Sequence, residues 1–121
     1  MINSSDSTPE QLLPLSIPVF QILISLAERD LHGYGIIGDI RTRTGDELVL
    51  STSTLYGAIK RMMRDQLIEE SAVRPAPELD DERRRYYRIT LFGREVADRE
   101  ARRIERLADA IRGKQFQTRG P

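Results

Sequence analysis

The chain has 121 residues, a formal net charge of zero and no cysteine. This length suits a single domain with a buried core, and the lack of cysteine excludes disulfides, thiolate nucleophiles and cysteine zinc sites. The first ten residues lack the basic and apolar regions of a secretory signal, and the most apolar segment, 19–27, is too short to span a bilayer. We therefore expect a cytoplasmic protein with no membrane segment, and neither a cofactor nor a metal site.

Apolar residues at helical spacing predict two helices in the first third of the chain. The first begins after Ser16, whose hydroxyl can cap it, and Pro18 suits a first turn because its missing N–H needs no partner there. Its apolar residues are Val19, Phe20, Leu23, Leu26 and Ala27. A turn at 31–35 precedes the second helix, 34–43, whose buried residues are Ile36, Ile37 and Ile40.

A third helix is expected to begin after Ser51, preceded by a short strand at 48–50. Its inner stripe is formed by Leu55, Ile59 and Met62, at spacings of four and three. The opposite face carries hydroxyl, aromatic and basic side chains, namely Thr52, Ser53, Tyr56, Lys60 and Arg64. The third helix therefore has one apolar face and one polar, positively charged face.

The second half of the chain predicts a hairpin followed by a long helix. Residues 68–73 form a strand that prolines 75 and 77 end, and residues 86–89 return as its partner. Thr90 caps a last helix that runs to about residue 112. The fold class is mainly α with a small β-hairpin, as in a winged helix-turn-helix domain with a C-terminal helix added.

The last helix carries an apolar stripe that a small domain cannot cover completely. Its length is about 33 Å, and a heptad-like seam runs along it with Glu100 as a charged interruption. The seam residues are Ala97, Ile104, Leu107 and Ile111. Packing on the first helix accounts for part of the stripe, and a homodimer contact for the rest. We divide the chain into a flexible N-terminal segment (1–14), a winged helix-turn-helix domain (15–90), a dimerisation helix (91–112) and a flexible tail (113–121).

The charges are distributed so that a neutral chain can present a basic face. The balance of basic over acidic residues is −4 in 1–40, +3 in 41–64, −6 in 65–82 and +7 in 83–121. Positive charge therefore gathers on the third helix and after the hairpin tip, which suits an anionic partner such as DNA.

The outer face of the third helix has the chemistry of a DNA-reading surface. The hydroxyls of Thr52 and Ser53 lie at a positive helix N-terminus that suits phosphate, Tyr56 can reach phosphate or a thymine methyl, and Lys60 a guanine edge. Taken singly, each side chain also fits a merely solvated helix. Gly57 favours the first interpretation, because an interior glycine costs a helix about 1 kcal/mol, and close approach to DNA, or to another helix, would explain it.

Three blocks of sequence resemble the signature motifs of the PadR family of transcriptional regulators. They are H-G-Y-G-I-I at 32–37, S-T-L-Y-G-A-I-K-R at 53–61 and R-R-R-Y-Y-R-I-T-L-F-G-R at 83–94. The resemblance extends from about Leu15 to Arg112 and is closest to the short subgroup with one C-terminal helix. It implies a homodimeric repressor that binds a palindromic operator in double-stranded DNA and releases it when a small-molecule effector or another signal arrives.

The resemblance also implies roles for individual residues. Thr52, Ser53, Tyr56 and Lys60 would enter the major groove, with Arg61 or Arg64 near phosphates. The wing would carry Arg83, Arg84 and Arg85, and the last helix would hold the dimer contact. The chain departs from the family at the wing tip, where three acids replace a glycine, and in the last helix, where residues 93–115 contain no aromatic side chain for a flat drug.

The function classes can be ranked from these features. An enzyme is excluded because the chain has one histidine, no paired carboxylates and no glycine-rich phosphate loop. A winged-helix module that contacts proteins without binding specific DNA is the alternative, favoured by the acidic wing tip and the neutral total. The sequence favours a DNA-binding regulator over this alternative.

Overall fold

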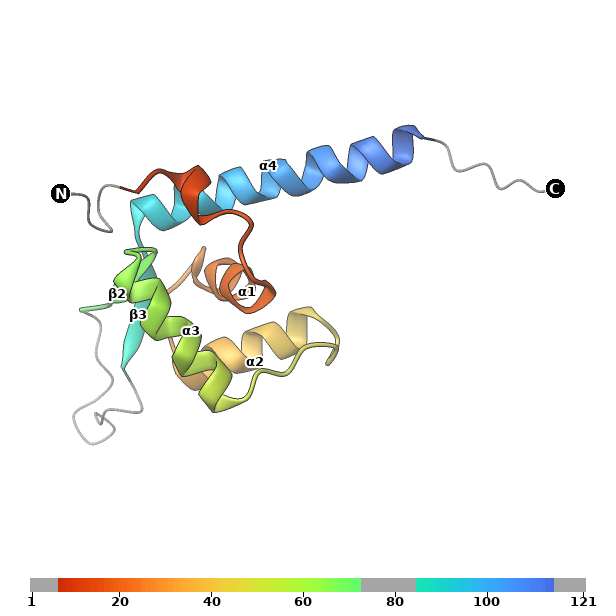
Figure 1. Ribbon diagram of the computed structural model, residues 1–121. Coiled ribbons are helices and arrows are strands. Elements are labelled where there is room, and N and C mark those ends of the chain that lie inside the picture. The colour runs from red at the N-terminus through yellow and green to blue at the C-terminus, as the bar shows by residue number, and fades with distance from the viewer. Residues whose placement is uncertain (1–6, 73–84, 115–121) are drawn as a thin grey trace.

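The computed structural model describes residues 7–72 and 85–114, which form a helical domain with a small sheet and one long projecting helix (Figure 1). The helices are α1 (Ile17–Leu26), α2 (Gly33–Arg43), α3 (Thr52–Arg64) and α4 (Leu91–Gly113), and the strands are β1 (Leu31–His32), β2 (Ile68–Glu70) and β3 (Tyr86–Ile89). This mainly helical architecture confirms the predicted fold class.

The helix starts follow from the local sequence. The hydroxyl of Ser16 accepts the Val19 N–H at 3.3 Å, and the hydroxyl of Thr90 accepts the Gly93 N–H at 2.9 Å. These contacts satisfy N–H groups that have no partner inside a helix. The predicted starts of α1 and α4 are therefore confirmed.

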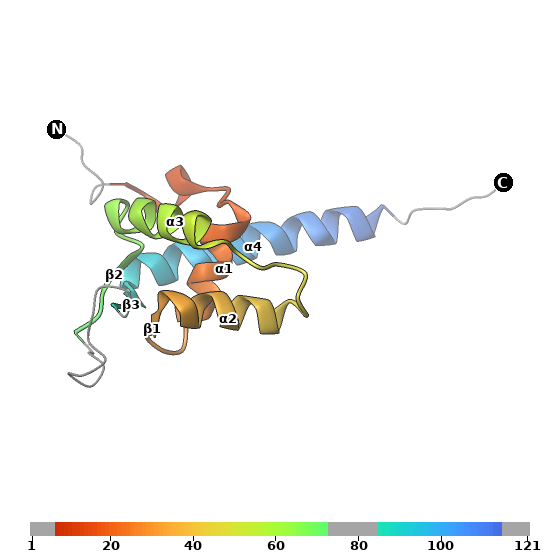
Figure 2. The same ribbon diagram turned by 90° about the horizontal axis from the view of Figure 1, so that it is seen from below.

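The core lies where α1, α2 and α3 meet the sheet and the beginning of α4. Its residues come from all four helices and from β2 and β3, and the largest fully buried apolar ones are Ile22, Leu23, Leu26, Ile36, Ile40, Leu55, Met62, Ile68 and Val96. Helices α2 and α3 lie side by side across this core in both views (Figures 1 and 2).

The sheet has three antiparallel strands in the order β1-β3-β2, where the sequence predicted a two-stranded hairpin. Leu31 pairs with Tyr87 on one side of β3, and Ile68 pairs with Ile89 on the other. The turn before α2 therefore also serves as a strand. The strand expected at 48–50 was wrong: no strand partner is available there, and the segment carries Leu50 into the core as an extended connection.

The segment before α1 is more ordered than expected. We predicted a flexible segment up to residue 14, but Pro9–Leu12 form a 3-10 helix, η2, that contacts α4. Leu12, Leu13 and Leu15 pack against the core cluster. The strand predicted over 68–73 was too long, because β2 ends at Glu70. Residue 73, the prolines, the acidic tip, Arg83, Arg84 and the tail from 115 lie outside the described residues.

Candidate nucleic-acid interface

Helix α3 turns a continuous polar stripe toward solvent. Its inner face buries Leu55, Ala58, Ile59 and Met62. Ser53, Gly57, Lys60 and Arg64 recur at spacings of four, three and four on the opposite side, so they fall on one face of the helix. The side chains of Ser53, Lys60 and Arg64 are exposed. We name these four residues the outer stripe.

The N-terminus of α3 is surrounded by hydroxyl groups. Ser51 accepts the Thr54 N–H at 3.1 Å, and its own hydroxyl also lies 3.0 Å from the Thr54 hydroxyl. Thr52 and Ser53 are exposed, and their backbone N–H groups lie in the first turn, where a helix supplies no carbonyl partner. Open donors at the positive end of a helix dipole create a local preference for an anion.

The basic side chains of α3 differ in how strongly they are held. In the part of the chain that the structure describes, neither Lys60 nor Arg61 forms an ion pair. Arg64 has Nε 3.5 Å from an Asp65 carboxylate oxygen and keeps 68% of its side chain exposed. These cations are therefore available to an external partner.

Tyr56 was expected on the exposed face, and this expectation was wrong. The side chain is half-buried and packs against the core, and a Cβ added at Gly33 would lie 2.3 Å from its hydroxyl oxygen. Burial raises the pKa of Tyr56, and the neighbouring Tyr34 raises it further. Residue 56 follows Leu55 by only 100° around the helix, so it lies at the edge between the two faces. From there its side chain contacts Gly33 at the beginning of α2.

Gly57 lies in the middle of the outer stripe with open space above it. The nearest atom to a Cβ added there is Nη1 of Arg61, at an ordinary contact distance of 3.7 Å. Helix packing therefore does not require a glycine at this position. Of the two explanations offered from the sequence, close packing against another helix therefore does not apply within the described residues.

The base of the wing is electrically neutralised by pairs across β2 and β3. Arg88 donates to Glu69 with an Nε to oxygen distance of 2.8 Å, and Nε of Arg85 lies 3.5 Å from Glu70. Of the three predicted wing arginines, only Arg85 is among the described residues. The described part of the wing thus contributes paired rather than open positive charge.

A short joint connects the end of α3 to the beginning of α4. The Thr90 hydroxyl donates to the Gln66 carbonyl at 2.7 Å, and a Cβ added at Gly93 would lie 2.1 Å from the Leu67 carbonyl oxygen. The first turn of α4 therefore presses directly on the chain that follows α3. A change in the direction of α4 would therefore move the residues that follow α3.

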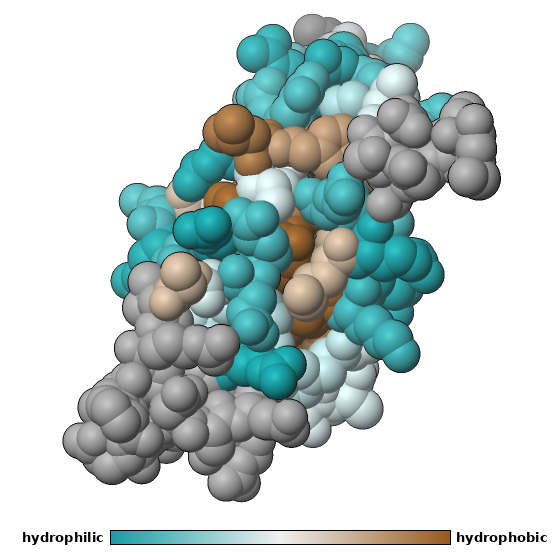
Figure 3. All heavy atoms as spheres, turned by 90° about the vertical axis from the view of Figure 1, so that its left-hand side faces the viewer, coloured by the Kyte–Doolittle hydropathy of each residue, from teal (hydrophilic) through white to brown (hydrophobic). Residues whose placement is uncertain are grey.

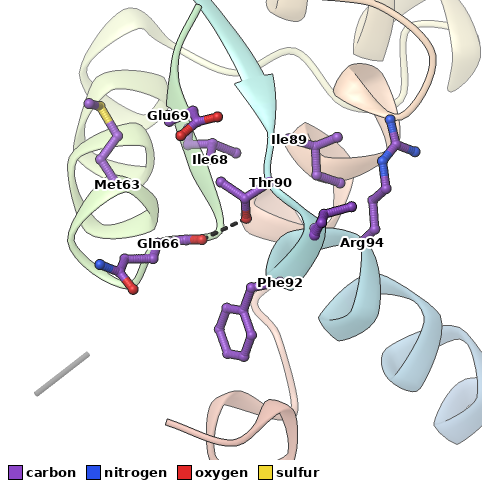
Figure 4. Close-up of a pocket in the computed structure, with 9 residues that line it drawn as sticks. Met63, Gln66, Ile68, Glu69, Ile89, Thr90, Phe92 and Arg94 are labelled. Carbon is purple, nitrogen blue, oxygen red and sulfur yellow. Dashed lines mark hydrogen bonds between the residues drawn. The ribbon is translucent and has the colours of Figure 1, made fainter. Parts of the chain in front are cut away.

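A shallow groove of about 550 Å³, lined by both polar and apolar side chains, lies beside the joint (Figure 4). Side chains from the end of α3, both strands of the hairpin and the start of α4 surround it, including Met63, Ile68, Ile89 and Phe92. Seen from this side, apolar surface is visible between hydrophilic flanks (Figure 3). Leu91, at the same place, is 85% exposed.

The apolar stripe of α4 is covered in its first half and open in its second half. Ala97 packs against the core cluster, whereas Ile104, Leu107 and Ile111 are 41%, 57% and 49% exposed. Both ribbon views show the second half of α4 projecting beyond the other helices (Figures 1 and 2). These three exposed residues continue the face of α4 that is buried in its first half.

Glu100 is a buried carboxylate whose partners the sequence did not predict. Its side chain accepts the Leu15 N–H at 2.9 Å and binds Arg103 at 2.5 Å and 3.1 Å. The Arg103 hydrogen bond lowers the pKa of Glu100 and, with the Leu15 N–H, outweighs the opposing effect of burial. The signal in the sequence was an acid at an apolar position of the seam, which indicates a satisfied buried carboxylate.

No helix in the described ranges is long and apolar enough to cross a membrane. Within the same ranges, no group of three or more histidine or acidic residues could hold a metal ion.

Comparison with known proteins gives consistent matches. The chain is 37% identical over 90 residues to an uncharacterized 37.1 kDa protein in transposon TN4556 of Streptomyces fradiae, which covers 74% of this chain but only 24% of that protein. A transcriptional regulator from Clostridium thermocellum is 29% identical, with a TM-score of 0.66 over 83% of this chain and 90% of its own. Bacillus subtilis PadR in complex with operator DNA is 20% identical, with a TM-score of 0.59 over 70% of this chain and 46% of its own.

The family assignment rests on most of the folded domain. Residues 22–99, from the middle of α1 to the middle of α4, match the transcriptional regulator PadR-like family. Members of this family are transcriptional regulators and not enzymes. The winged-helix fold and the sequence match together show that this chain belongs to the PadR-like family of transcriptional regulators.

Proposed function

We propose that the chain is a signal-responsive repressor that binds a palindromic DNA operator as a homodimer. The outer stripe of α3 is the observation that carries this proposal. It combines open hydroxyl and N–H donors at its beginning, a bare Gly57 in its middle and the unpaired Lys60 beside it. A helix of this kind fits the major groove, where side chains read base edges and the helix N-terminus binds phosphate.

The residues of α3 divide into reading and positioning roles. Ser53 and Lys60 project from the stripe and are the candidates for base edges, while Thr52 lies nearer the phosphates at the helix start. Arg61 and Arg64 flank the stripe and bind phosphates, which fixes the register without reading sequence. The family resemblance also makes Arg83, Arg84 and Arg85 candidates for DNA contacts, although only Arg85 is among the described residues and there it lies 3.5 Å from Glu70. Tyr56 packs against α2 with its hydroxyl beside Gly33, so we assign it a positioning role.

The second half of α4 forms the dimer contact through Ile104, Leu107 and Ile111. A single α3 reads one half-site, and two must lie about 34 Å apart to enter successive major grooves. An apolar stripe on a helix that projects from the domain requires a partner, because exposed apolar area is removed from water when it pairs. Pairing of α4 therefore sets the distance between the two reading helices.

The joint between α3 and α4 provides a route from signal to release. Because Gly93 of α4 packs on the chain directly after α3, a signal that reorients the paired α4 helices also moves the reading helix. A small displacement of either α3 changes the 34 Å separation of the two reading helices, so that both no longer fit successive major grooves. The Bacillus subtilis PadR structure, which shares this fold and is described as bound to operator DNA, supports the placement of such a domain on DNA.

A second candidate function, a protein-contact module, is favoured by the neutral wing base. The pairs of Arg88 with Glu69 and of Arg85 with Glu70 leave little open positive charge on the described part of the wing. Such a module would bind DNA weakly and without sequence preference.

Selection of bound sequences from random duplex DNA tests the proposal directly. A homodimeric reader should enrich a palindrome whose half-sites are about 10 to 10.5 base pairs apart, or a multiple of that distance. A Lys60→Ala variant should lose preference at particular positions, while an exposed substitution remote from α3, such as Lys114→Ala, should enrich the same palindrome. Recovery of unrelated sequences by the unmodified protein would favour the protein-contact module.

A further inference from the structure

Four arginines recur along one side of α4, remote from the outer stripe and beside the apolar seam. They are Arg99, Arg102, Arg103 and Arg106. Spacings of three, four and seven residues bring side chains together on one face of an α-helix. With Glu10 and Leu13 from the segment around η2, they line a pocket of about 250 Å³. The lining residues thus comprise four cations, one anion and one apolar side chain.

The arginines are oriented by carboxylates but remain accessible. Arg99 binds Glu10 and also lies 3.2 Å from Glu95, Arg102 lies 2.9 Å from Asp98, and Arg103 lies 2.5 Å from Glu100. The side chains of Arg99, Arg102 and Arg103 keep 43%, 65% and 33% of their surface exposed. Arg106 is exposed and has no ion pair within residues 7–72 and 85–114. Each guanidinium has five donors, so one carboxylate neighbour leaves donors for a ligand.

We propose that this pocket binds a small multivalent anion with the charge density of a tricarboxylate or a diphosphate. Guanidinium forks match carboxylate and phosphate oxygens in pairs. Arg106 carries the open charge of the pocket, and the carboxylate-paired Arg99, Arg102 and Arg103 supply further donors. The pocket is smaller than the 300–1,000 Å³ typical of drug-sized ligands. Leu13 provides one apolar wall.

Occupation of the pocket opens a clamp between the N-terminal segment and α4. Glu10 forms an ion pair with Arg99, and Glu100 forms one with Arg103. Glu100 also accepts a hydrogen bond from the Leu15 N–H at 2.9 Å. An incoming anion competes with both carboxylates. Leu15 directly precedes Ser16, the cap of α1, so release of this clamp changes how α4 sits on the domain. Its effect on DNA rests on the proposed function, whereas binding of the anion does not.

Calorimetric titration of the full chain with citrate and with pyrophosphate tests the site, at constant ionic strength because salt screens exposed charges. Glu10→Gln should tighten binding about fivefold by removing the competing carboxylate, and Arg106→Gln should weaken it about fivefold. Arg112→Gln, an exposed cation on the same helix outside the pocket, is the matched control and should leave the affinity unchanged. Binding of either probe with this pattern supports the site, and the two arms identify the preferred anion.

Amide chemical shifts locate the bound anion independently of any DNA. The proposal predicts that the signals of residues 9–15 and 99–106 move on titration, with Leu15 prominent among them, while those of 51–54 at the start of α3 do not. Absence of binding by both probes overturns the proposal, as does equal weakening by Arg106→Gln and Arg112→Gln. Shifts confined to the start of α3 would place the anion on the DNA surface instead and would also overturn it. Normal anion binding without operator binding would refute only the proposed function.

Discussion

At the scale of single residues, Gly57 and Tyr56 show how the faces of α3 differ in purpose. Gly57 has free space around it and no structural need to be glycine. Tyr56, which the sequence placed on the reading face, is instead wedged against Gly33. The sequence could assign helix faces to within about one residue position. Whether a residue at the boundary between two faces is buried depends on its tertiary neighbour, and here Gly33 on α2 leaves space for the ring of Tyr56.

Gly57→Ala and Gly57→Leu separate stability from DNA binding. The alanine variant should be more stable by about 1 kcal/mol, because glycine is the poorer helix former. The leucine variant should fold normally but bind operator at least about tenfold more weakly, because its side chain fills the space needed for DNA. Chemical denaturation and fluorescence-anisotropy titration measure the two effects. Unchanged operator affinity of the leucine variant would show that DNA does not approach this position.

Tyr56→Ala and Tyr56→Phe separate packing from contact with DNA. Loss of the half-buried ring should cost about 2 kcal/mol of unfolding free energy, less than the 3–5 kcal/mol typical of a fully buried aromatic residue. The phenylalanine variant keeps the ring and should retain nearly full stability, so any loss of its operator affinity reports the hydroxyl alone. If Tyr56→Ala were as stable as the unmodified protein, the packing role assigned to this ring would be incorrect.

At the scale of elements, the sequence predicted all four main helices and the hairpin, because their signals are local. Ser16, Ser51 and Thr90 mark the helix starts, and each makes the expected cap. It did not predict β1 or the 3-10 helix η2. Both depend on partners distant in the chain, since β1 forms only beside β3 and η2 contacts α4.

Ile104→Glu tests the role of α4 in dimerisation. A carboxylate placed in an apolar contact loses hydration without gaining a partner, so the variant should sediment as a monomer or a weakened dimer and lose tight operator binding. The residue is 41% exposed within one chain, so the monomer should still fold. Ala110→Glu introduces the same charge on another side of the helix and should remain dimeric. A normal dimer of Ile104→Glu would move the contact elsewhere.

Glu100→Gln tests the buried clamp through its pH dependence. The variant should be less stable at neutral pH by about 1–3 kcal/mol, because it loses the charge that Arg103 and the Leu15 N–H stabilise. The pKa of Glu100 is lowered in the folded protein. Its stabilisation is therefore complete above the unfolded value of about 4.3 and disappears as pH falls through the folded value.

The stability difference between Glu100→Gln and the unmodified protein should accordingly shrink between neutral pH and about pH 3. Urea denaturation across this range measures it. Glu105→Gln, an exposed change on the same helix, serves as the control and should show only a small difference throughout. If the difference in unfolding free energy between Glu100→Gln and the unmodified protein did not vary with pH, the charge of this carboxylate would contribute nothing to stability.

At the scale of the whole molecule, the joint at Thr90 and Gly93 connects α3, the proposed reading helix, to α4, the proposed dimerisation helix. The three sequence blocks predicted the family, and the match over residues 22–99 confirms it. The net charge of zero gave no indication of a basic surface. Only the fold shows that the cations of α3 remain open while those at the wing base are paired.

The central claim is that the two α3 helices of a dimer bind DNA through open cations. The salt dependence of binding to the selected palindrome tests this claim most directly. If each subunit neutralises about three phosphates, the slope of log affinity against log salt concentration should be near −5 for the dimer. Arg64→Ala should reduce its magnitude by about two, one phosphate contact from each subunit. A slope near zero, or one unaltered by Arg64→Ala, would contradict the assignment of this helix face to DNA.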